Sequence, residues 1–182
     1  DHIDTEYCDS HNVAWRTAPG CNASSVEQYV TSSLMHLAAK HSFSLRNKTI
    51  GIVGVGNVGT KVAAACTKLG MRVLLNDPPR SENEPHNKNM FVDMATIKQE
   101  ADIITFHTPL IKQGEHKTYH LADESFFGTL AKKPFIINSS RGSVICTDSI
   151  KKAIRNNYIA GAVIDCWENE PTIDRELLSM VE

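Results

Sequence analysis

The sequence of 182 residues lacks any apolar run that could cross a membrane, and it lacks concentrated charge of either sign. Its longest apolar stretches, such as Ile50–Gly56, are far shorter than the roughly 18 residues that a transmembrane helix needs. The net charge is −2, and the basic residues form only isolated pairs such as Lys132–Lys133, which excludes the electrostatic footprint of a nucleic-acid or acidic-lipid ligand. We therefore expect neither a membrane nor a nucleic-acid partner.

Cysteines with the spacing of a metal site are also lacking. The five cysteines are odd in number, widely spaced and never form a Cys-x-x-Cys pair, which argues against a disulfide framework and against bound zinc. This usage predicts a reducing, cytoplasmic compartment and no metal ion. The sequence has neither an initiator methionine nor a signal-like segment, so we expect it to be part of a longer protein.

What the sequence does have is an alternation of strand and helix signals in a chain of ordinary globular composition, with 41% hydrophobic and 22% charged residues. Apolar runs predict strands over residues 13–16, 49–54, 72–76, 102–106, 135–137 and 158–164. Helical periodicity predicts helices over residues 23–41, 58–69, 94–100, 147–156 and 173–180, and one near Glu124. Segment 77–89 has no period and predicts a loop. Continuous apolar strands alternating with helices indicate a doubly wound parallel α/β sheet of the Rossmann type.

A glycine-rich stretch, "GIVGVGNVGT", follows the strand at 49–54 and opens the next helix. In a dinucleotide-binding loop Gly54 would permit the tight turn, Gly56 would let the backbone approach a pyrophosphate, and Gly59 would let helix and strand pack closely. The N–H groups of Asn57 and Val58 would face the phosphates at the positive end of the helix. The alternative is that these glycines serve only a tight turn.

An acidic residue, Asp77, follows the strand at 72–76 and lies 18 positions after Gly59. A carboxylate there can accept both ribose hydroxyls of NAD and repels a 2′-phosphate, so we expect NAD rather than NADP. Arg80 nearby weakens this preference. Aspartate before Pro78 is also a common way to start a turn, which is the alternative role.

Polar residues also follow the strand at 102–106. His107 and Thr108 lie at the carboxyl end of this strand, which is where open α/β sheets bind ligands. We interpret Thr108 as a candidate cofactor contact. A lone histidine at such a place is more often a structural hydrogen-bonding residue than a catalyst, and we interpret His107 in that way.

Arg141 and Gly142 follow the buried strand at 135–137. Arginine can bind a carboxylate through two parallel hydrogen bonds, and the neighbouring glycine would let the substrate approach closely. This pair is therefore a candidate substrate site. A surface ion pair is the alternative. Asp165, Glu168 and Glu170 follow the last predicted strand and would either tune a proton-transfer group or solvate a loop.

In their order and spacing, the glycine loop, Asp77, "FHTPL", "INSSRG" and "DCWENEP" resemble the D-2-hydroxyacid dehydrogenase family. The resemblance covers nearly the whole chain and implies NAD as the cofactor. It implies that Arg141 holds the substrate carboxylate and polarises its C2 oxygen, and that Glu170 orients a catalytic histidine. It further implies nicotinamide contacts, which are Asp165 at the carboxamide and Ser139 and Ser140 beside the ring.

The resemblance also divides the chain. Residues 1–21 would be the tail of a substrate domain and residues 22–182 the dinucleotide-binding domain. The family's histidine lies in a Pro-His-x-x-Gly stretch expected beyond Glu182, so we expect the chain alone to be inactive. Cys146 stands where many relatives carry an acidic residue, and we expect Thr147 to cap the helix that follows. The resemblance implies a homodimer for the intact protein.

Five short stretches, "APGCNA", "GIVGVGNVG", "NDPPR", "TFHTPL" and "HKTYHLADE", are most similar to one branch of the family. That branch oxidises 4-phospho-D-erythronate to 2-oxo-3-hydroxy-4-phosphobutanoate during the synthesis of pyridoxal phosphate, a vitamin B6 form. One alternative is that the protein is a dehydrogenase of the same family with another substrate, such as 3-phosphoglycerate, hydroxypyruvate or glyoxylate. The other alternative is that it is not an enzyme but an NAD-sensing module that resembles corepressors. The presence of both Arg141 and Glu170 favours an enzyme, because a sensor needs neither.

Overall fold

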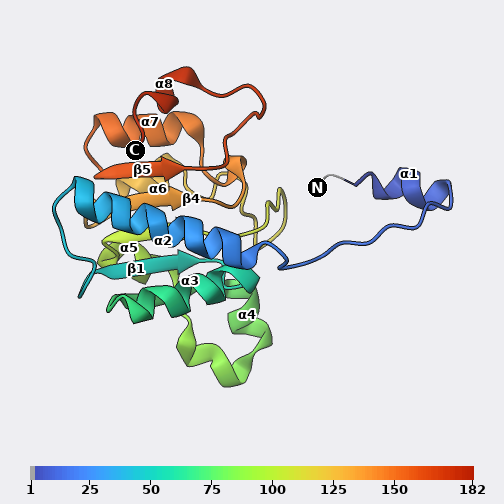
Figure 1. The fold of residues 1–182 in the computed structure, drawn as a ribbon, viewed down its shortest axis with the longest axis horizontal. Coiled ribbons are helices and arrows are strands. Elements are labelled where there is room, and N and C mark those ends of the chain that lie inside the picture. The colour runs from blue at the N-terminus through green and yellow to red at the C-terminus, as the bar shows by residue number, and fades with distance from the viewer. Residues whose placement is uncertain (1–2) are drawn as a thin grey trace.

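The computed structural model describes residues 3–182 and is built around one parallel sheet (Figure 1). The sheet has five strands in the order β2-β1-β3-β4-β5, and every neighbouring pair is parallel. The strands are β1 Thr49–Val53, β2 Arg72–Asn76, β3 Ile103–Phe106, β4 Phe135–Asn138 and β5 Gly161–Ile164. The predicted doubly wound α/β fold is confirmed.

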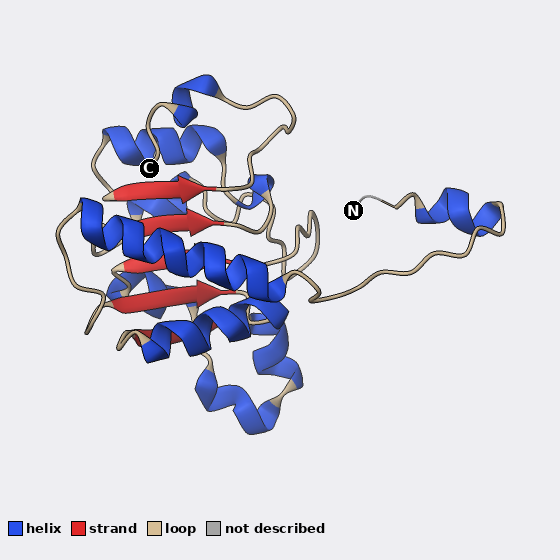
Figure 2. Ribbon diagram, viewed as in Figure 1, coloured by secondary structure: helices blue, strands red, loops and turns tan. Residues whose placement is uncertain are grey.

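Helices cover both faces of this sheet (Figure 2). One face is covered by α2 Ala23–Lys40 and α3 Asn57–Lys68. The other face is covered by α5 Met94–Glu100, α6 Glu124–Gly128 and α7 Thr147–Arg155, with α8 Arg175–Leu178 beside α7. Successive strand residues alternate between the two cores, as Ile103 packs with α2 and α3 while Ile104 packs on the opposite side. Because both faces are covered, β1, β3 and β4 are buried at every position.

Aspartate side chains fix where several of the short helices begin. Asp93, Asp123 and Asp174 each accept a hydrogen bond from the backbone N–H three residues later, at the start of α5, α6 and α8. Such a cap satisfies one of the N–H groups that the first helical turn leaves without a partner. The starts of these helices are therefore encoded locally.

The amino-terminal segment differs from its prediction. Residues 13–16 are extended but pair with no strand in the described part of the chain, so the predicted strand is wrong. They belong to an arm that leads away from the sheet and ends in α1 Thr5–Ser10, a helix that was not predicted and that buries none of its residues (Figure 1). An apolar run forms a strand only where a partner edge is available, and here none lies alongside.

The segment after β2 also differs, because it is not the predicted loop. It contains α4 Pro78–Asn83 and the 3₁₀ helix η1 Pro85–Met90. Asp77 occupies the N-cap of α4, where its side chain accepts from the N–H of Arg80, and prolines occupy the first helical positions. Proline suits these positions because its φ is already helical and no donor is needed there.

Thr147 does not cap α7 as predicted. The N-cap position belongs to Cys146, which makes no side-chain cap, and Thr147 is the first helical residue. The Thr147 N–H instead donates to Oε2 of Glu168 at 3.0 Å. A carboxylate from a distant loop therefore supplies the cap, which local sequence could not reveal. Asn22 holds the N-cap position of α2, as predicted, but its side chain makes no capping hydrogen bond.

Candidate functional site

All five strands end along one line at the carboxyl edge of the sheet. The parallel register aligns their last residues, which are Asn76, Val53, Phe106, Asn138 and Ile164. The chain therefore leaves the sheet at the same edge five times, and open α/β sheets bind their ligands there. Residues that follow these ends include the predicted Gly54, Asp77, Thr108, Ser139 and Asp165.

The glycine loop is packed tightly at two of its three glycines. Gly54 has a φ of +89°, and a Cβ there would lie 2.8 Å from the carbonyl of His107. A Cβ on Gly59 would lie 2.1 Å from the carbonyl oxygen of Gly54, so α3 packs on the end of β1 only without a side chain at this position. The space beside Gly56 is open, because no heavy atom lies within 4 Å of the Cβ position. The loop thus leaves room where a ligand's phosphates were predicted to approach.

The first turn of α3 borders this open space. Gly56 is the N-cap and offers no side chain to the turn, and Asn57 and Val58 are its first residues. The N–H groups of a first turn have no carbonyl partner within their own helix and carry the positive end of the helix dipole. An anion beside Gly56 would therefore meet backbone donors, which is the arrangement that the sequence predicted.

Asp77 is held in place from two sides. Its Oδ2 accepts from the N–H of Val55 at 2.7 Å, and its Oδ1 accepts from the N–H of Arg80 at 3.1 Å. Asp77 therefore also has the alternative role considered from the sequence, because its side chain caps the first turn of α4. A carboxylate has about four lone-pair sites, so two hydrogen bonds leave further sites that can accept from ribose hydroxyls.

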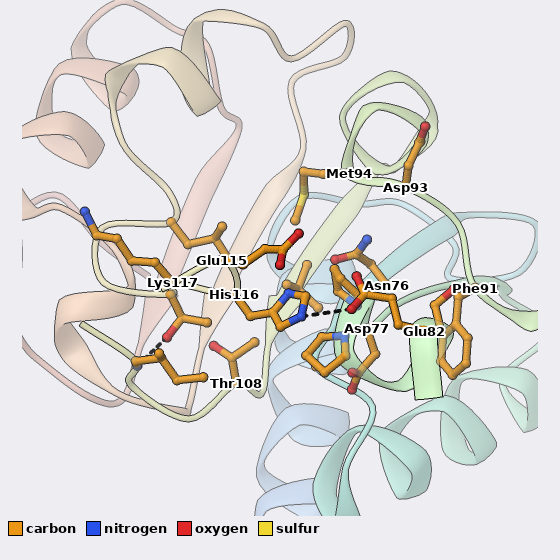
Figure 3. Close-up of a pocket in the computed structure, with 18 of the residues that line it drawn as sticks. Asn76, Asp77, Glu82, Phe91, Asp93, Met94, Thr108, Glu115, His116 and Lys117 are labelled. Atoms are coloured by element: carbon orange, nitrogen blue, oxygen red, sulfur yellow. Dashed lines mark hydrogen bonds and ion pairs between the residues drawn. The ribbon is translucent and has the colours of Figure 1, made fainter. Parts of the chain in front are cut away.

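A pocket of about 900 Å³ opens beside Asp77 (Figure 3). Its walls come from the start of α4, from Phe91 to Met94, and from the loop after β3. His116 and Glu82 join two of these walls through a contact of 3.1 Å between Nε2 and Oε2. Sequence reasoning missed Phe91, Met94 and His116, since they lie in aperiodic segments that only the fold brings together. Apolar walls with a few polar groups suit an aromatic base.

Arg80, which was expected to weaken the preference for NAD, is already paired. Its Nε and Nη2 donate to the two carboxylate oxygens of Glu84 at 2.7 Å and 2.8 Å. Its Nη1 donates to the carbonyl of Val55 at 2.5 Å, and the guanidinium lies 5.4 Å from the centre of the Phe91 ring. Hydrogen bonds, chiefly from Arg80, lower the pKa of Glu84 to about 2, so the partner is fully charged at neutral pH.

His107 and Thr108, which follow β3, differ in the hydrogen bonds that their side chains make. His107 is only partly exposed, its Nε2 lies 3.0 Å from Oγ1 of Thr105, and its Nδ1 is buried without a hydrogen-bond partner among residues 3–182. Burial lowers the pKa of His107 to about 4, so the ring is neutral at pH 7, which supports the structural interpretation. Oγ1 of Thr108 is buried without a hydrogen-bond partner among residues 3–182. Buried hydroxyls are nearly always paired, so this oxygen fits a contact to a ligand.

The turn after β4 is organised by Asn138, a buried residue that sequence reasoning did not single out. Its Oδ1 accepts from the N–H and hydroxyl of Ser140 at 3.2 Å and 2.8 Å, and its Nδ2 donates to the carbonyl of Arg141 at 3.0 Å. The hydroxyl of Ser140 is thus part of the turn. Oγ of Ser139 is buried without a partner in the described chain, as Oγ1 of Thr108 is. An asparagine at the end of a buried strand was the available signal.

Gly142 allows another group to approach its Cα closely, but that group is the backbone of Trp167 and Glu168 and not a ligand. A Cβ on Gly142 would lie 2.0 Å from the carbonyl of Trp167 and 2.4 Å from the N atom of Glu168. The turn after β4 and the loop after β5 are therefore in direct backbone contact. The predicted reason for this glycine, room for a substrate, is replaced by the packing of these two segments.

Cys166, in the loop after β5, experiences the charges of three of the predicted site residues, two from its own loop and one from the turn after β4. Burial is the main reason why the pKa of this thiol rises to about 11, and the charges of Asp165 and Glu170 raise it further while Arg141 opposes them. All three charged groups therefore act electrostatically on one side chain. Glu170 is exposed, and its Oε1 accepts from the N–H of Trp167 at 2.6 Å.

Glu168 is a structural link in this loop. Its Oε1 lies 2.5 Å from Nε2 of His120, and its Oε2 caps α7 through Thr147. The backbone N–H of His120 donates to the carbonyl of Ser143 at 2.8 Å. The segment around His120 thus joins the Arg141-bearing turn to the loop that carries Asp165 and Glu170.

The family model for "D-isomer specific 2-hydroxyacid dehydrogenase, NAD binding domain" matches residues 20–182. The chain belongs to this family. Among curated relatives, the erythronate-4-phosphate dehydrogenase of Bacteroides thetaiotaomicron is 55% identical over 186 residues, covering 100% of this chain and 51% of that protein. The enzyme of the same name from Porphyromonas gingivalis is 46% identical over 183 residues, covering 100% and 49%. The chain spans about half the length of the curated relatives it matches.

Solved structures show the same fold for this family member. The NAD-dependent formate dehydrogenase of Staphylococcus aureus, solved in complex with NAD, has a TM-score of 0.80 at 24% identity and covers 100% of this chain and 59% of its own. The D-lactate dehydrogenase of Escherichia coli has a TM-score of 0.77 at 25% identity, covering 94% and 58%. The described part of the chain contains no helix with the length and apolarity needed to cross a membrane. Within residues 3–182, no three His, Cys, Asp or Glu side chains are grouped to hold a metal ion.

The contact between Gly59 and Gly54 gives a stability prediction. Gly59→Ala would place a methyl group against the Gly54 carbonyl, so we expect a loss of roughly 1–3 kcal/mol in the free energy of unfolding. Gly56→Ala is the matched control, since its methyl group would enter open space. Denaturant titration of both variants measures this difference. Equal stability of the two variants would show that α3 does not depend on this contact.

The burial of His107 gives a prediction for pH dependence. The folded-state pKa near 4 lies below the ordinary value of 6.5, so between these values the unfolded chain binds a proton that the folded chain does not. Stability therefore falls as the pH drops through this window, by about 2 kcal/mol from this residue between pH 7 and pH 5. Urea unfolding at the two pH values should show a smaller difference for His107→Gln. The exposed His36→Gln is the control, and an unchanged slope in His107→Gln contradicts the assignment.

Proposed function

We propose that the chain is the cofactor-binding part of an NAD-dependent dehydrogenase that oxidises 4-phospho-D-erythronate to 2-oxo-3-hydroxy-4-phosphobutanoate in pyridoxal phosphate synthesis. The observation that carries this proposal is the alignment of the whole chain with erythronate-4-phosphate dehydrogenases at 42–55% identity. Residues 22–182 form the dinucleotide-binding domain. Residues 1–21 are the tail of the substrate domain, and the projection of the arm away from the sheet supports this division.

The residues at the carboxyl edge fit NAD. The open space at Gly56 and the first turn of α3 at Asn57 and Val58 suit its pyrophosphate, while Gly54 and Gly59 shape the loop. Asp77 accepts from the adenosine ribose, and the pocket beside it takes the adenine. The hydroxyls of Thr108 and Ser139, which are buried without partners in the described chain, hydrogen-bond to the nicotinamide half, with Ser140 and Asp165 flanking it. When bound, NAD accepts the hydride from C2 of the substrate.

Arg141 binds the substrate carboxylate and polarises the C2 oxygen. The Asn138 turn fixes the backbone of Arg141, so the guanidinium is delivered at the edge where the cofactor loop also ends. Glu170 orients a histidine that takes the hydroxyl proton and that the family resemblance places after residue 182. The backbone contact between Gly142 and Trp167, whose N–H donates to Glu170, supports a shared site for Arg141 and Glu170.

The intact protein is a homodimer in the cytoplasm, and its partner at the site is a small phosphorylated 2-hydroxy acid. The five cysteines are free thiols, which supports a reducing compartment. The net charge of −2 and the absence of basic clusters in the sequence support a protein without nucleic-acid or membrane partners.

Binding of the cofactor is tested with Gly56→Ala in the full-length protein. A methyl group there would fill the space that receives the pyrophosphate, so we expect NAD affinity to fall by at least about tenfold with little change in stability. Gly128→Ala is the control, because that position is equally open but lies at the end of α6. Calorimetric titration gives both affinities, and equal NAD affinity in the two variants would contradict the placement of the pyrophosphate.

The substrate is tested with an assay of the full-length protein. We expect NADH to form faster from 4-phosphoerythronate than from 3-phosphoglycerate at equal concentration. Arg141→Lys should lower kcat/KM about 100-fold, because lysine cannot make the planar two-bond grip that stabilises the developing charge. Arg46→Lys, an exposed change before β1, should leave kcat/KM unchanged. Preferential turnover of 3-phosphoglycerate would overturn the proposed substrate.

A further inference from the structure

The cluster of Asp77, Arg80 and Glu84 beside the glycine loop carries an inference about cofactor choice, and it rests on the proposed function. We propose that Glu84 excludes NADP by occupying Arg80, so that Glu84 is a specificity-determining residue for NAD. Aspartate at the end of the second strand is the known NAD signal of such folds. This protein also carries an arginine three residues later, so the aspartate alone does not decide the choice.

Asp77 and Arg80 meet at one residue of the loop. Val55 donates its N–H to Oδ2 of Asp77 at 2.7 Å, and its carbonyl accepts from Nη1 of Arg80 at 2.5 Å. The carboxylate that selects a ribose hydroxyl and the guanidinium that could receive a 2′-phosphate are therefore anchored side by side. An arginine near this aspartate is the usual means by which dinucleotide folds accommodate NADP.

Glu84 accepts hydrogen bonds from the two Arg80 donors that a phosphate would otherwise bind. The Nε and Nη2 donors form a planar fork, and both point to the Glu84 carboxylate at 2.7 Å and 2.8 Å. Arginine binds phosphate through the same kind of paired donors, so carboxylate and phosphate compete for one fork. Asn87 donates to Oε2 of Glu84 at 3.0 Å and holds the carboxylate in place. The side chains of Arg80 and Glu84 remain 32% and 34% exposed, so the chain does not bury the pair away from a ligand.

The charges of the cluster lead to the same expectation. Asp77 and Glu84 each contribute −1 and Arg80 contributes +1, which leaves a net charge of −1 facing a 2′-phosphate that carries about −1.5 to −2. Removal of the Glu84 charge makes the cluster neutral and releases the fork. Hydroxyl recognition by Asp77 does not involve Glu84, so NAD affinity should hardly change.

Glu82, in the last turn of α4, provides a matched control for Glu84, which follows that helix directly. It lies two residues from Glu84 and carries the same charge, but its Oε2 contacts Nε2 of His116 rather than Arg80. Glu82→Gln therefore removes one negative charge from α4 without releasing the guanidinium. The comparison separates a specific effect through Arg80 from a general change in the charge of the pocket.

The experiment measures the dissociation constants of NAD and NADP by calorimetric titration of the full-length protein, without substrate. We expect wild type to bind NAD at least about 100-fold more tightly than NADP. Glu84→Gln should tighten NADP about tenfold and change NAD less than about twofold. Glu82→Gln should leave the ratio of the two constants unchanged. Arg80→Gln added to Glu84→Gln should return NADP to its wild-type affinity.

Three outcomes would overturn the inference. The first is unchanged NADP affinity in Glu84→Gln, which would reduce the Arg80–Glu84 pair to a structural ion pair at the end of α4. The second is an equal gain in Glu82→Gln, which would make the effect one of general charge. The third is a gain in Glu84→Gln that survives the loss of Arg80. Failure of the wild-type protein to bind NAD is a distinct result, because it would overturn the proposed function on which the inference rests.

Discussion

The site depends on the contact between Gly59 and the carbonyl of Gly54. That contact lets the first turn of α3 lie directly on the end of β1, at a distance that no side chain would permit. Gly54 is itself enclosed, since its N–H donates to the carbonyl of Asn76 at 2.9 Å and its Cα faces the backbone of His107. The loop is thus fixed by both neighbouring strands, and only the side at Gly56 stays open.

Once the loop is fixed, the positions of the other groups follow from the hydrogen bonds of its peptide groups. Val55 presents its N–H to Asp77 and its carbonyl to Arg80, so the second strand's acidic residue and the start of α4 are tied to the loop. On the other side of the sheet edge, backbone contact at Gly142 ties the turn after β4 to the loop after β5. Each half of the site is therefore held together by its own backbone contacts, and the parallel register of the strands sets one half beside the other.

The parts of this structure that could be predicted from sequence are those encoded by local patterns. The strands were found because burial on both faces demands unbroken apolar runs, as in Ile103–Phe106. The glycine loop was found because its chemistry fixes its spacing. The strand expected at residues 13–16 was wrong because a strand also needs a partner edge, which the sequence pattern does not report.

The features that were missed depend on contacts between distant residues. The cap of α7 comes from Glu168, 21 residues after Thr147, and the walls of the pocket join His116 to Glu82, 34 residues apart. Neither contact has a signal in the local sequence.

Two other features do have a local signal. The start of α4 is encoded by an Asp-Pro-Pro sequence, and the turn after β4 by an asparagine at the end of a strand.

The alignment of the five strand ends has a consequence for how such a protein can change over evolutionary time. Each strand contributes its own connecting segment to the edge, and the ladder behind it is held by backbone hydrogen bonds that are indifferent to what those segments contain. The segment after β2 can thus be remodelled without disturbing the turn after β4. Under the proposed function, cofactor choice and substrate choice would be carried by separate segments of the chain, so selection could act on one while the other is kept.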